Sequence, residues 1–177
     1  MTESLSQQRR DLKDWLIAAR PALERKSWRE AFGSYPRLDL SMQPVPWSAP
    51  VTDLRNTRVM LVGSAGIVPR GQQPFDALTA LGDPSIRLIP GDAKLSESSI
   101  VHEHYDTAPA TEDRNCVYPL DRLRELAAAG IIGGLTRHHI SFSGFLPDWD
   151  MAMHHLAPSI VREAVACGAQ AAVLVPV

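Results

Sequence analysis

Short apolar runs separated by turn residues set the pattern of the central and C-terminal sequence. Residues 58–62 (RVMLV) form the clearest run, and residues 86–89 and 171–177 form two more. A run of this length that ends in glycine or proline is typical of a strand buried on both faces. Weaker runs at 131–135 and 140–142 predict two further strands.

Helical segments fill the intervals between these runs. Residues 120–129 alternate acidic with basic side chains at helical spacing, and residues 147–167 form a second segment that Gly168 would end. Strands that alternate with helices predict an α/β fold with a mostly parallel, Rossmann-like sheet flanked by helices. Ligands of such sheets bind beyond the carboxyl ends of the strands, so the turn at residues 63–66 is a candidate binding loop.

The N-terminal part of the chain differs in pattern from the rest. Apolar residues recur at three-and-four spacing between Ser4 and Ala31, which predicts a helical arm that Pro21 breaks or kinks. A proline-rich stretch follows and predicts an extended strap anchored by burial of the Trp47 ring. We therefore divide the chain into an N-terminal arm and start of the strap, residues 1–45, and an α/β domain, residues 46–177.

Composition and charge exclude several classes of function. The chain has 177 residues, of which 45% are hydrophobic, so it can bury a sizeable core. Its 18 basic and 20 acidic residues are scattered, so we expect neither nucleic acid nor a membrane as a partner. The charged N-terminus and the lack of long apolar runs predict a cytoplasmic protein. Cys116 and Cys167 are too few for a disulfide scaffold.

The segment with the most chemistry contains His102, His104 and Asp106. In an extended conformation these side chains would share one face, while Glu103 and Tyr105 would take the other. Two imidazoles and a carboxylate could bind a divalent metal or transfer protons. A hydrogen-bonded histidine pair that lines a pocket is the simpler interpretation, so we expect no bound metal, with these three residues as the alternative ligands.

Other candidate residues lie in loops that the predicted fold brings toward the strand ends. The turn with Ser64 and Gly66 lacks the lysine of a P-loop and a complete dinucleotide motif, so its glycines would instead leave Ser64 and free amides facing a pocket. Asn115 could face the crevice or could form the turn before a helix. His138 precedes a strand and could also reach the crevice.

The final apolar run, residues 171–177, reads as a buried strand that no helix follows. In a parallel sheet a crossover would normally carry the chain back after such a strand, and a site would be built at its end. We therefore expect the α/β domain to be incomplete at its C-terminal end.

Five segments of the domain form its most specific pattern: VMLVGSAGIVPRGQQPFD, IRLIPGD, IVHEHYD, DRNCVYPLDRLRELAAAGIIGGL and HHISFSGFLPD. Together they resemble the selenoprotein B family of glycine, sarcosine and betaine reductases and D-proline reductase. The resemblance covers roughly residues 46 to 177 and leaves out the helical arm. It implies reductive cleavage of a carbon–nitrogen bond in an amino acid or related amine, within a complex of several subunits.

The resemblance also implies where the redox centre belongs. In that family a selenocysteine, or a cysteine in its place, lies in a U-x-x-C or C-x-x-C motif directly after the strand that here reads AAVLVPV, and this sequence lacks the motif. Because UGA encodes both stop and selenocysteine, we hypothesise that the reading frame was ended at a UGA codon. We expect no cofactor within the chain itself and a selenocysteine or cysteine pair downstream.

The resemblance casts His102, His104 and Asp106 as catalytic neighbours of that centre, which would orient the substrate or deliver a proton to the leaving amine. Tyr105 and Ser64 would donate hydrogen bonds. The predicted substrate-binding residues are Ser64, Gly66, Tyr105, Asn115 and His138.

Two alternatives stay open. If the chain ends at residue 177, a small-molecule-binding or regulatory module is the better interpretation. A metal-dependent enzyme would instead use His102, His104 and Asp106. The expected partners are a small amine or amino-acid substrate and either other reductase subunits or a second copy of the chain.

Overall fold

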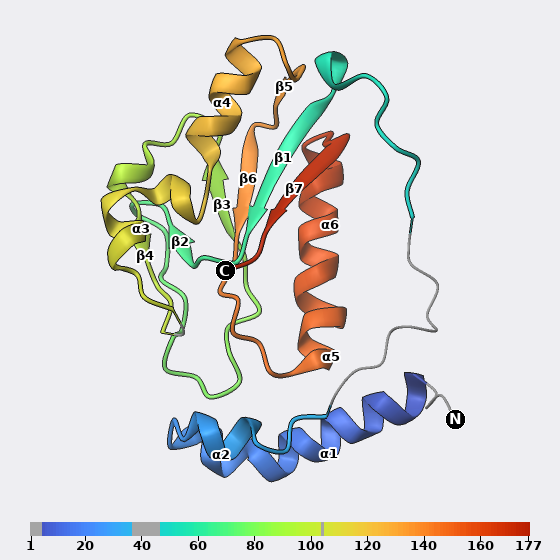
Figure 1. The fold of residues 1–177 in the computed structure, drawn as a ribbon, viewed down its shortest axis with the longest axis vertical. Helices are drawn as coiled ribbons and strands as arrows, with labels where there is room; N and C mark the ends of the chain where they lie inside the picture. The colour runs from blue at the N-terminus through green and yellow to red at the C-terminus, as the bar shows by residue number, and fades with distance from the viewer. Residues whose placement is uncertain (1–4, 37–46, 104) are drawn as a thin grey trace.

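The structure is a computed structural model that describes residues 5–36, 47–103 and 105–177. A sheet lies between helices, and a helical arm lies across one end of it (Figure 1). The helices are α1 (Leu5–Glu24), α2 (Trp28–Phe32), α3 (Ala108–Glu112), α4 (Leu120–Ala128), α5 (Trp149–Met151) and α6 (Ala157–Ala166), with single turns η1 (Leu54–Asn56), η2 (Leu95–Glu97), η3 (Arg114–Cys116) and a π-helical turn η4 (Ala152–Leu156). The strands are β1 (Arg58–Gly63), β2 (Ile67–Val68), β3 (Arg87–Pro90), β4 (Ser99–Ile100), β5 (Gly134–Leu135), β6 (His138–Ser141) and β7 (Ala171–Val175).

The main sheet is centred on β1. One edge of β1 pairs in parallel first with β5 and then with β6, and its other edge pairs in parallel with β7 along residues 59–63. β3 is antiparallel to β6, and β2 and β4 form a separate antiparallel ribbon. The predicted fold is therefore confirmed: a mostly parallel sheet with helices on both faces, preceded by a helical arm (Figure 1).

A histidine side chain completes the pairing of β1 between the residues that pair with β5 and those that pair with β6. The Leu61 N–H donates a hydrogen bond to Nδ1 of His139 over 3.0 Å, where a strand carbonyl would otherwise accept. Since Nδ1 is the acceptor, the imidazole is neutral and its proton lies on Nε2. Burial, with smaller effects of Arg124 and His138, lowers the pKa of His139 to about 4, which keeps the ring in this form.

The two faces of β1 pack against different clusters. Leu61 joins the core under α3 and α4, whereas Met60 and Val62 join the core next to α6. Tyr118 is fully buried in the first core, and its hydroxyl donates to the carbonyl oxygen of Ile140 over 3.1 Å. The chain thus buries both sides of the strand that the sequence marks most clearly.

The last helical segment follows the prediction closely. The Asp148 side chain accepts hydrogen bonds from the backbone N–H groups of Asp150 and Met151 and so begins α5. Because Pro158 has no N–H to complete the α-helical pattern, the π-helical turn η4 lies just before it. Gly168, with φ of 64°, ends the segment as expected.

Two outcomes concern the helical arm and the strap that follows it. α1 continues past Pro21 to Glu24, so the proline does not break the helix, and a kink at this position stays a prediction. The predicted burial of Trp47 is wrong, because its side chain is 87% exposed. The predicted boundary at residue 45 lies outside the described residues. Within residues 5–36, 47–103 and 105–177, no helix is both long and apolar enough to span a bilayer.

A candidate active site at the carboxyl ends of the strands

Three loops meet where β1, β6 and β7 end. The Ser64 N–H donates to the carbonyl of Val175 over 3.1 Å, the Gly144 N–H donates to the carbonyl of Ser64 over 3.0 Å, and the Gly66 N–H donates to the carbonyl of Phe142 over 3.0 Å. These bonds fix the segments that follow three parallel strands against one another. Such an edge is where α/β sheets bind ligands.

Residue 177 lies at this edge, beside the predicted binding serine. The backbone N–H of Val177 donates to Oγ of Ser64 over 2.8 Å. Ser64 is buried, while Val177 is 41% exposed. Because the serine oxygen accepts this bond, its own O–H can donate to a second group. The structure therefore brings Ser64 and the last residue of the chain together.

An apolar groove of about 770 Å³ opens beside Val177, between β7 and α6. It is lined by Val62, Ser64, Phe142, Gly144, Ala157, Ile160, Val161, Leu174, Val175, Pro176 and Val177. Two of the apolar lining side chains are strongly exposed, Leu174 at 70% and Val161 at 60%. The groove could not be predicted from the sequence, because the apolar residues of β7 and α6 form the same pattern whether other side chains cover them or leave them exposed.

Gly66 holds the segment with His102 close to the end of β1. Its φ of 71° favours glycine, and its carbonyl accepts a hydrogen bond from the Val101 N–H over 2.8 Å. A Cβ atom at this position would lie 2.2 Å from the Val101 carbonyl oxygen. The glycine therefore has a clear positional role, and its role in substrate binding stays a prediction.

His102 and Tyr105 contact each other near this edge. Their ring centroids are 4.7 Å apart, although an extended strand would have put them on opposite faces. The Tyr105 hydroxyl donates to the carbonyl oxygen of Ala65 over 3.0 Å. Burial raises the pKa of Tyr105, helped by Cys116 and opposed by Arg114, so the phenol stays neutral. Tyr105 thus links His102 to the turn that follows β1.

The structure describes Asp106 but not His104, the other two residues of the predicted catalytic set. Asp106 is exposed, and its carboxylate accepts a hydrogen bond from the Ala108 N–H over 3.0 Å at the start of α3. His104 lies outside the described residues. The shared face of His102, His104 and Asp106, and the metal site built on it, therefore stay predictions.

Asn115 lies in a different place from Ser64. Its amide nitrogen donates to the carboxylates of Asp113 and Asp121, and its amide oxygen accepts from the Asp121 N–H over 3.0 Å. These bonds hold the start of α4, as the turn-forming interpretation predicted. The residue borders a polar pocket of about 360 Å³ next to α3 and α4. Its predicted contact with the substrate is not supported by this position.

His138 is also not brought together with Ser64. It begins β6, so it lies at the amino end of a parallel strand, opposite to the end where β1 and β7 stop. Its neighbours there are Glu163 and Cys167 of the α6 segment, a contact that the sequence analysis missed. The Glu-x-x-x-Cys spacing was the available signal, because residues four apart share one face of a helix.

The helical arm forms a second wall near Tyr105. A pocket of about 540 Å³ is lined by Trp28, Phe32, Glu103, Tyr105 and Phe145. Lys26 forms an ion pair with Glu103 at 2.5 Å. The Trp28 and Phe145 rings lie edge to face with centroids 5.4 Å apart. The arm therefore contacts the same segment that carries His102.

Comparison with known proteins identifies the family. The family model of glycine/sarcosine/betaine reductase selenoprotein B (GRDB) matches residues 37–176. The D-proline reductase subunit gamma of Acetoanaerobium sticklandii is 32% identical over 131 residues, which are 74% of this chain and 53% of that protein. The glycine reductase complex component B subunit gamma of Symbiobacterium thermophilum is 35% identical over 97 residues, 54% of this chain and 23% of that protein.

The matched region is only part of these relatives. A third relative, the sarcosine reductase complex component B subunit beta of Peptoclostridium acidaminophilum, is 32% identical over 102 residues, or 56% of this chain and 23% of that protein. No solved structure matches the chain. The family match spans the α/β sheet and all three loops that meet at its carboxyl edge. The chain therefore belongs to the glycine/sarcosine/betaine reductase selenoprotein B family.

Proposed function

We propose that this chain is part of a reductase subunit that cleaves a carbon–nitrogen bond of an amino acid or related amine. Its redox centre is a selenocysteine or cysteine pair in polypeptide that follows Val177. The relatives are reductase subunits whose names include D-proline, glycine and sarcosine reductases, and the chain spans 53% and 23% of the first two relatives described above.

The position of Val177 carries this proposal. Its N–H bonds to Ser64 at the carboxyl edge of the sheet, so the next residues of a longer chain would begin beside the groove and close to the turn that Tyr105 contacts. A redox-active selenium or sulfur atom needs such a partly enclosed site, where backbone amides can stabilise its anion. The same edge is the usual ligand site of a parallel sheet.

The residues of this chain would bind the substrate and supply a proton. The Ser64 O–H can donate to a carboxylate oxygen of an amino acid. His102 can keep a primary or secondary amine protonated as its carbon–nitrogen bond breaks, since such an amine leaves readily only when protonated. Tyr105 holds the His102 segment through its bond to Ala65 rather than donating to the substrate. When present, the selenolate or thiolate would form a bond to carbon as the carbon–nitrogen bond breaks, and the second thiol of the pair would supply the two electrons of the reduction by forming a selenium–sulfur or disulfide bond.

The decisive experiment extends the chain. The genomic DNA after codon 177 is read, and the extended protein is produced and assayed with its partner subunits for amine release from glycine, sarcosine and betaine, and for ring opening of D-proline to 5-aminopentanoate. We expect an in-frame UGA, two codons and a cysteine codon directly after codon 177. With glycine, sarcosine or D-proline as the substrate, we also expect His102→Gln to lower kcat by about 100-fold or more, as for loss of a general acid.

The matched control is His154→Gln, which changes an exposed helical histidine and should leave kcat unchanged. Full activity of the His102→Gln variant would contradict the role of His102. Unrelated sequence or several stop codons after codon 177 would contradict the proposed redox centre.

A second candidate function is a small-molecule-binding or regulatory module, favoured by the apolar groove beside Val177. The same DNA sequence separates the two functions, because a module would lack the downstream redox motif. In that case the chain of 177 residues should itself bind a ligand in the groove, which isothermal titration calorimetry would measure.

A further inference from the structure

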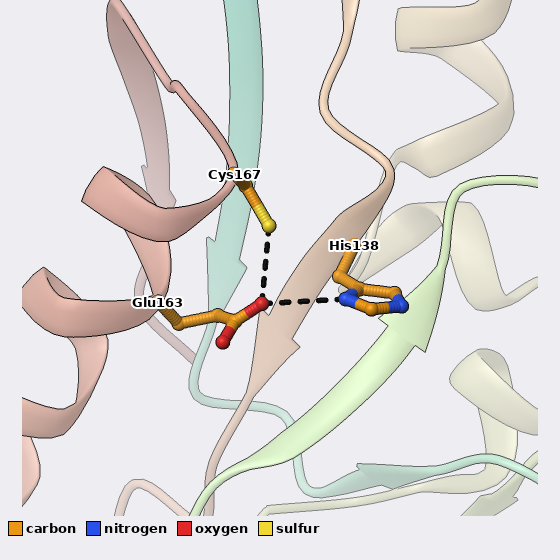
Figure 2. Close-up of side chains that lie close together, drawn as sticks. All are labelled: His138, Glu163 and Cys167. Carbon is orange, nitrogen blue, oxygen red and sulfur yellow. Dashed lines mark hydrogen bonds and ion pairs between the residues drawn. The ribbon is translucent and has the colours of Figure 1, made fainter.

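Three potential metal ligands converge at the amino end of the sheet, away from the candidate active site. His138 comes from β6, whereas Glu163 lies on α6 and Cys167 follows directly after it. Figure 2 shows the three side chains pointing toward one another, with the glutamate between the other two. One oxygen of Glu163 lies 3.3 Å from Nδ1 of His138 and 3.0 Å from Sγ of Cys167.

The geometry of this cluster suits a tetrahedral zinc ion. One ligand atom from each residue can be chosen so that all three lie within 4.8 Å of one another. Ordinary zinc bond lengths and tetrahedral angles put neighbouring ligand atoms roughly 3.3 to 3.6 Å apart. The two distances from the Glu163 oxygen, 3.3 and 3.0 Å, lie close to these values, and the imidazole nitrogen and the sulfur, which lie within 4.8 Å of each other, would approach each other around the ion. Imidazole, carboxylate and thiolate are all common zinc ligands.

The local fold already holds the ligands in place. Glu163 and Cys167 are four residues apart at the end of a helix, so they share one face, as metal ligands on helices often do. His138 starts a strand whose position is fixed by pairing with β3 and β1. Little conformational entropy would be lost on binding, because His138 and Glu163 lie in regular structure and the Cys167 N–H bonds to the carbonyl oxygen of Glu163 over 2.9 Å at the end of the helix.

Burial and charge also agree with a bound dication. Cys167 is only 8% exposed, and the side chain of Glu163 is 19% exposed. A zinc ion bound to one carboxylate, one thiolate and a neutral imidazole would leave the cluster without net charge.

We infer that His138, Glu163 and Cys167 form a binding site for Zn²⁺ or a similar divalent transition metal. Cys167 also lines a cavity of about 360 Å³ together with Arg58, Leu135, Arg137 and Ala166. A water molecule or a small anion would complete the coordination, and the two arginines would favour the anion. The bound ion would join α6 to β6 at the end of the sheet opposite to the groove.

This site is independent of the proposed reductase function. The competing interpretation is a purely structural cluster, in which Cys167 and His138 donate hydrogen bonds to Glu163. The two differ in the state of the sulfur, because a metal needs the thiolate whereas the hydrogen bond needs the thiol. Spectroscopy of the metal–sulfur bond therefore separates them.

The test uses tag-free protein titrated with Co²⁺, followed by competition with Zn²⁺. We expect about one Co²⁺ per chain, with the visible absorption of a tetrahedral site and a thiolate-to-cobalt charge-transfer band that Zn²⁺ abolishes. Cys167→Ser should remove the charge-transfer band, and His138→Gln and Glu163→Gln should each weaken binding by about 10-fold or more.

Two control variants change a cysteine and a histidine outside the proposed metal site. Cys116→Ser changes the exposed free cysteine, and His154→Gln changes an exposed helical histidine, so neither should alter the titration. Circular dichroism checks that each variant is folded. A wild-type protein that binds no Co²⁺ stoichiometrically would overturn the inference. So would a charge-transfer band that persists in Cys167→Ser or disappears in Cys116→Ser, and binding lost only in His102→Gln would place the metal in the other histidine segment.

Discussion

The two faces of the central sheet are covered to very different degrees. On the side of α3 and α4, Leu61, Tyr118 and Leu120 are fully buried in one continuous cluster. On the side of α6, Leu174 is 70% exposed and Val165 is 74% exposed, although the neighbouring β1 residues are buried. Figure 1 shows α6 alone beside β7 on this side, while α4 and the chain around α3 and β4 cover the other.

The difference shows that side chains of the edge strand β7 are left exposed, whereas those of the central strand β1 are covered. β1 has partners on both edges, and its side chains are buried on both faces. Among the described strands, β7 pairs with β1 alone. Its apolar side chains contribute to the groove instead of a closed core, and an exposed apolar surface of this kind often marks an interaction site.

The largest expected effect comes from deleting the same side chain on each face. We expect Leu61→Ala to lower the free energy of unfolding by about 3 kcal/mol, because it leaves a cavity in a closed core. Leu174→Ala should cost about 0.5 kcal/mol or less, because that side chain is mostly solvated already. Urea unfolding followed by circular dichroism measures both. Equal losses for the two variants would contradict the contrast between the faces.

The next effect concerns His139, which lies in the pairing between β1 and β6. Its pKa is about 4 in the folded protein, and an unfolded histidine titrates near 6.5. Below pH 6.5 the unfolded chain binds a proton that the folded chain does not, so stability is complete above this pH. It falls by up to about 3 kcal/mol as the pH drops toward 4. Protonation would also break the bond that Nδ1 accepts from Leu61.

Unfolding of the wild type and of His139→Gln at several pH values between 4 and 8 isolates this effect. The glutamine oxygen can accept the Leu61 hydrogen bond but does not titrate. We expect the difference in stability between the two proteins to change with pH mainly between 6.5 and 4. A difference that is constant over this range would show that His139 does not titrate as described.

The smallest expected effect on stability is on the open face. Val161→Lys places a charge at the groove, where the valine is 60% exposed, and should change the free energy of unfolding by no more than about 0.5 kcal/mol. It should nevertheless reduce the fluorescence of an apolar dye bound to the folded protein. Ile17→Lys is the control, because Ile17 is 74% exposed but lies on α1. A similar loss of fluorescence in both variants would argue against a distinct binding groove.

Much of the fold could be predicted from local patterns. The run at residues 58–62 became β1, the alternating charges at 120–129 became α4, and Gly168 ended the last helix. These features depend on neighbours a few positions away, so their signal is present in the sequence. The direction of β3 could not be predicted, because an apolar run reads the same in parallel and antiparallel pairing.

The candidate site could be predicted only in part. Ser64 and Gly66 follow the clearest strand, so the rule for parallel sheets put them at the ligand edge, where the structure has them. His138 was expected at the same edge, and its position at the start of β6 puts it at the other end. The difference has a simple cause, because the residues before and after a strand lie at its opposite ends, and the role of His138 in substrate binding stays a prediction.

The sequence by itself determined the main strands and helices of the domain, which turn follows β1, and which family motifs the chain carries. Only the tertiary structure decided that Val177 bonds to Ser64, that His139 completes the pairing of β1, and that His138 meets Glu163 and Cys167. Secondary structure follows from interactions between near neighbours, whereas these contacts join residues 25 to 113 positions apart. Their geometry exists only after the sheet and helices have packed together.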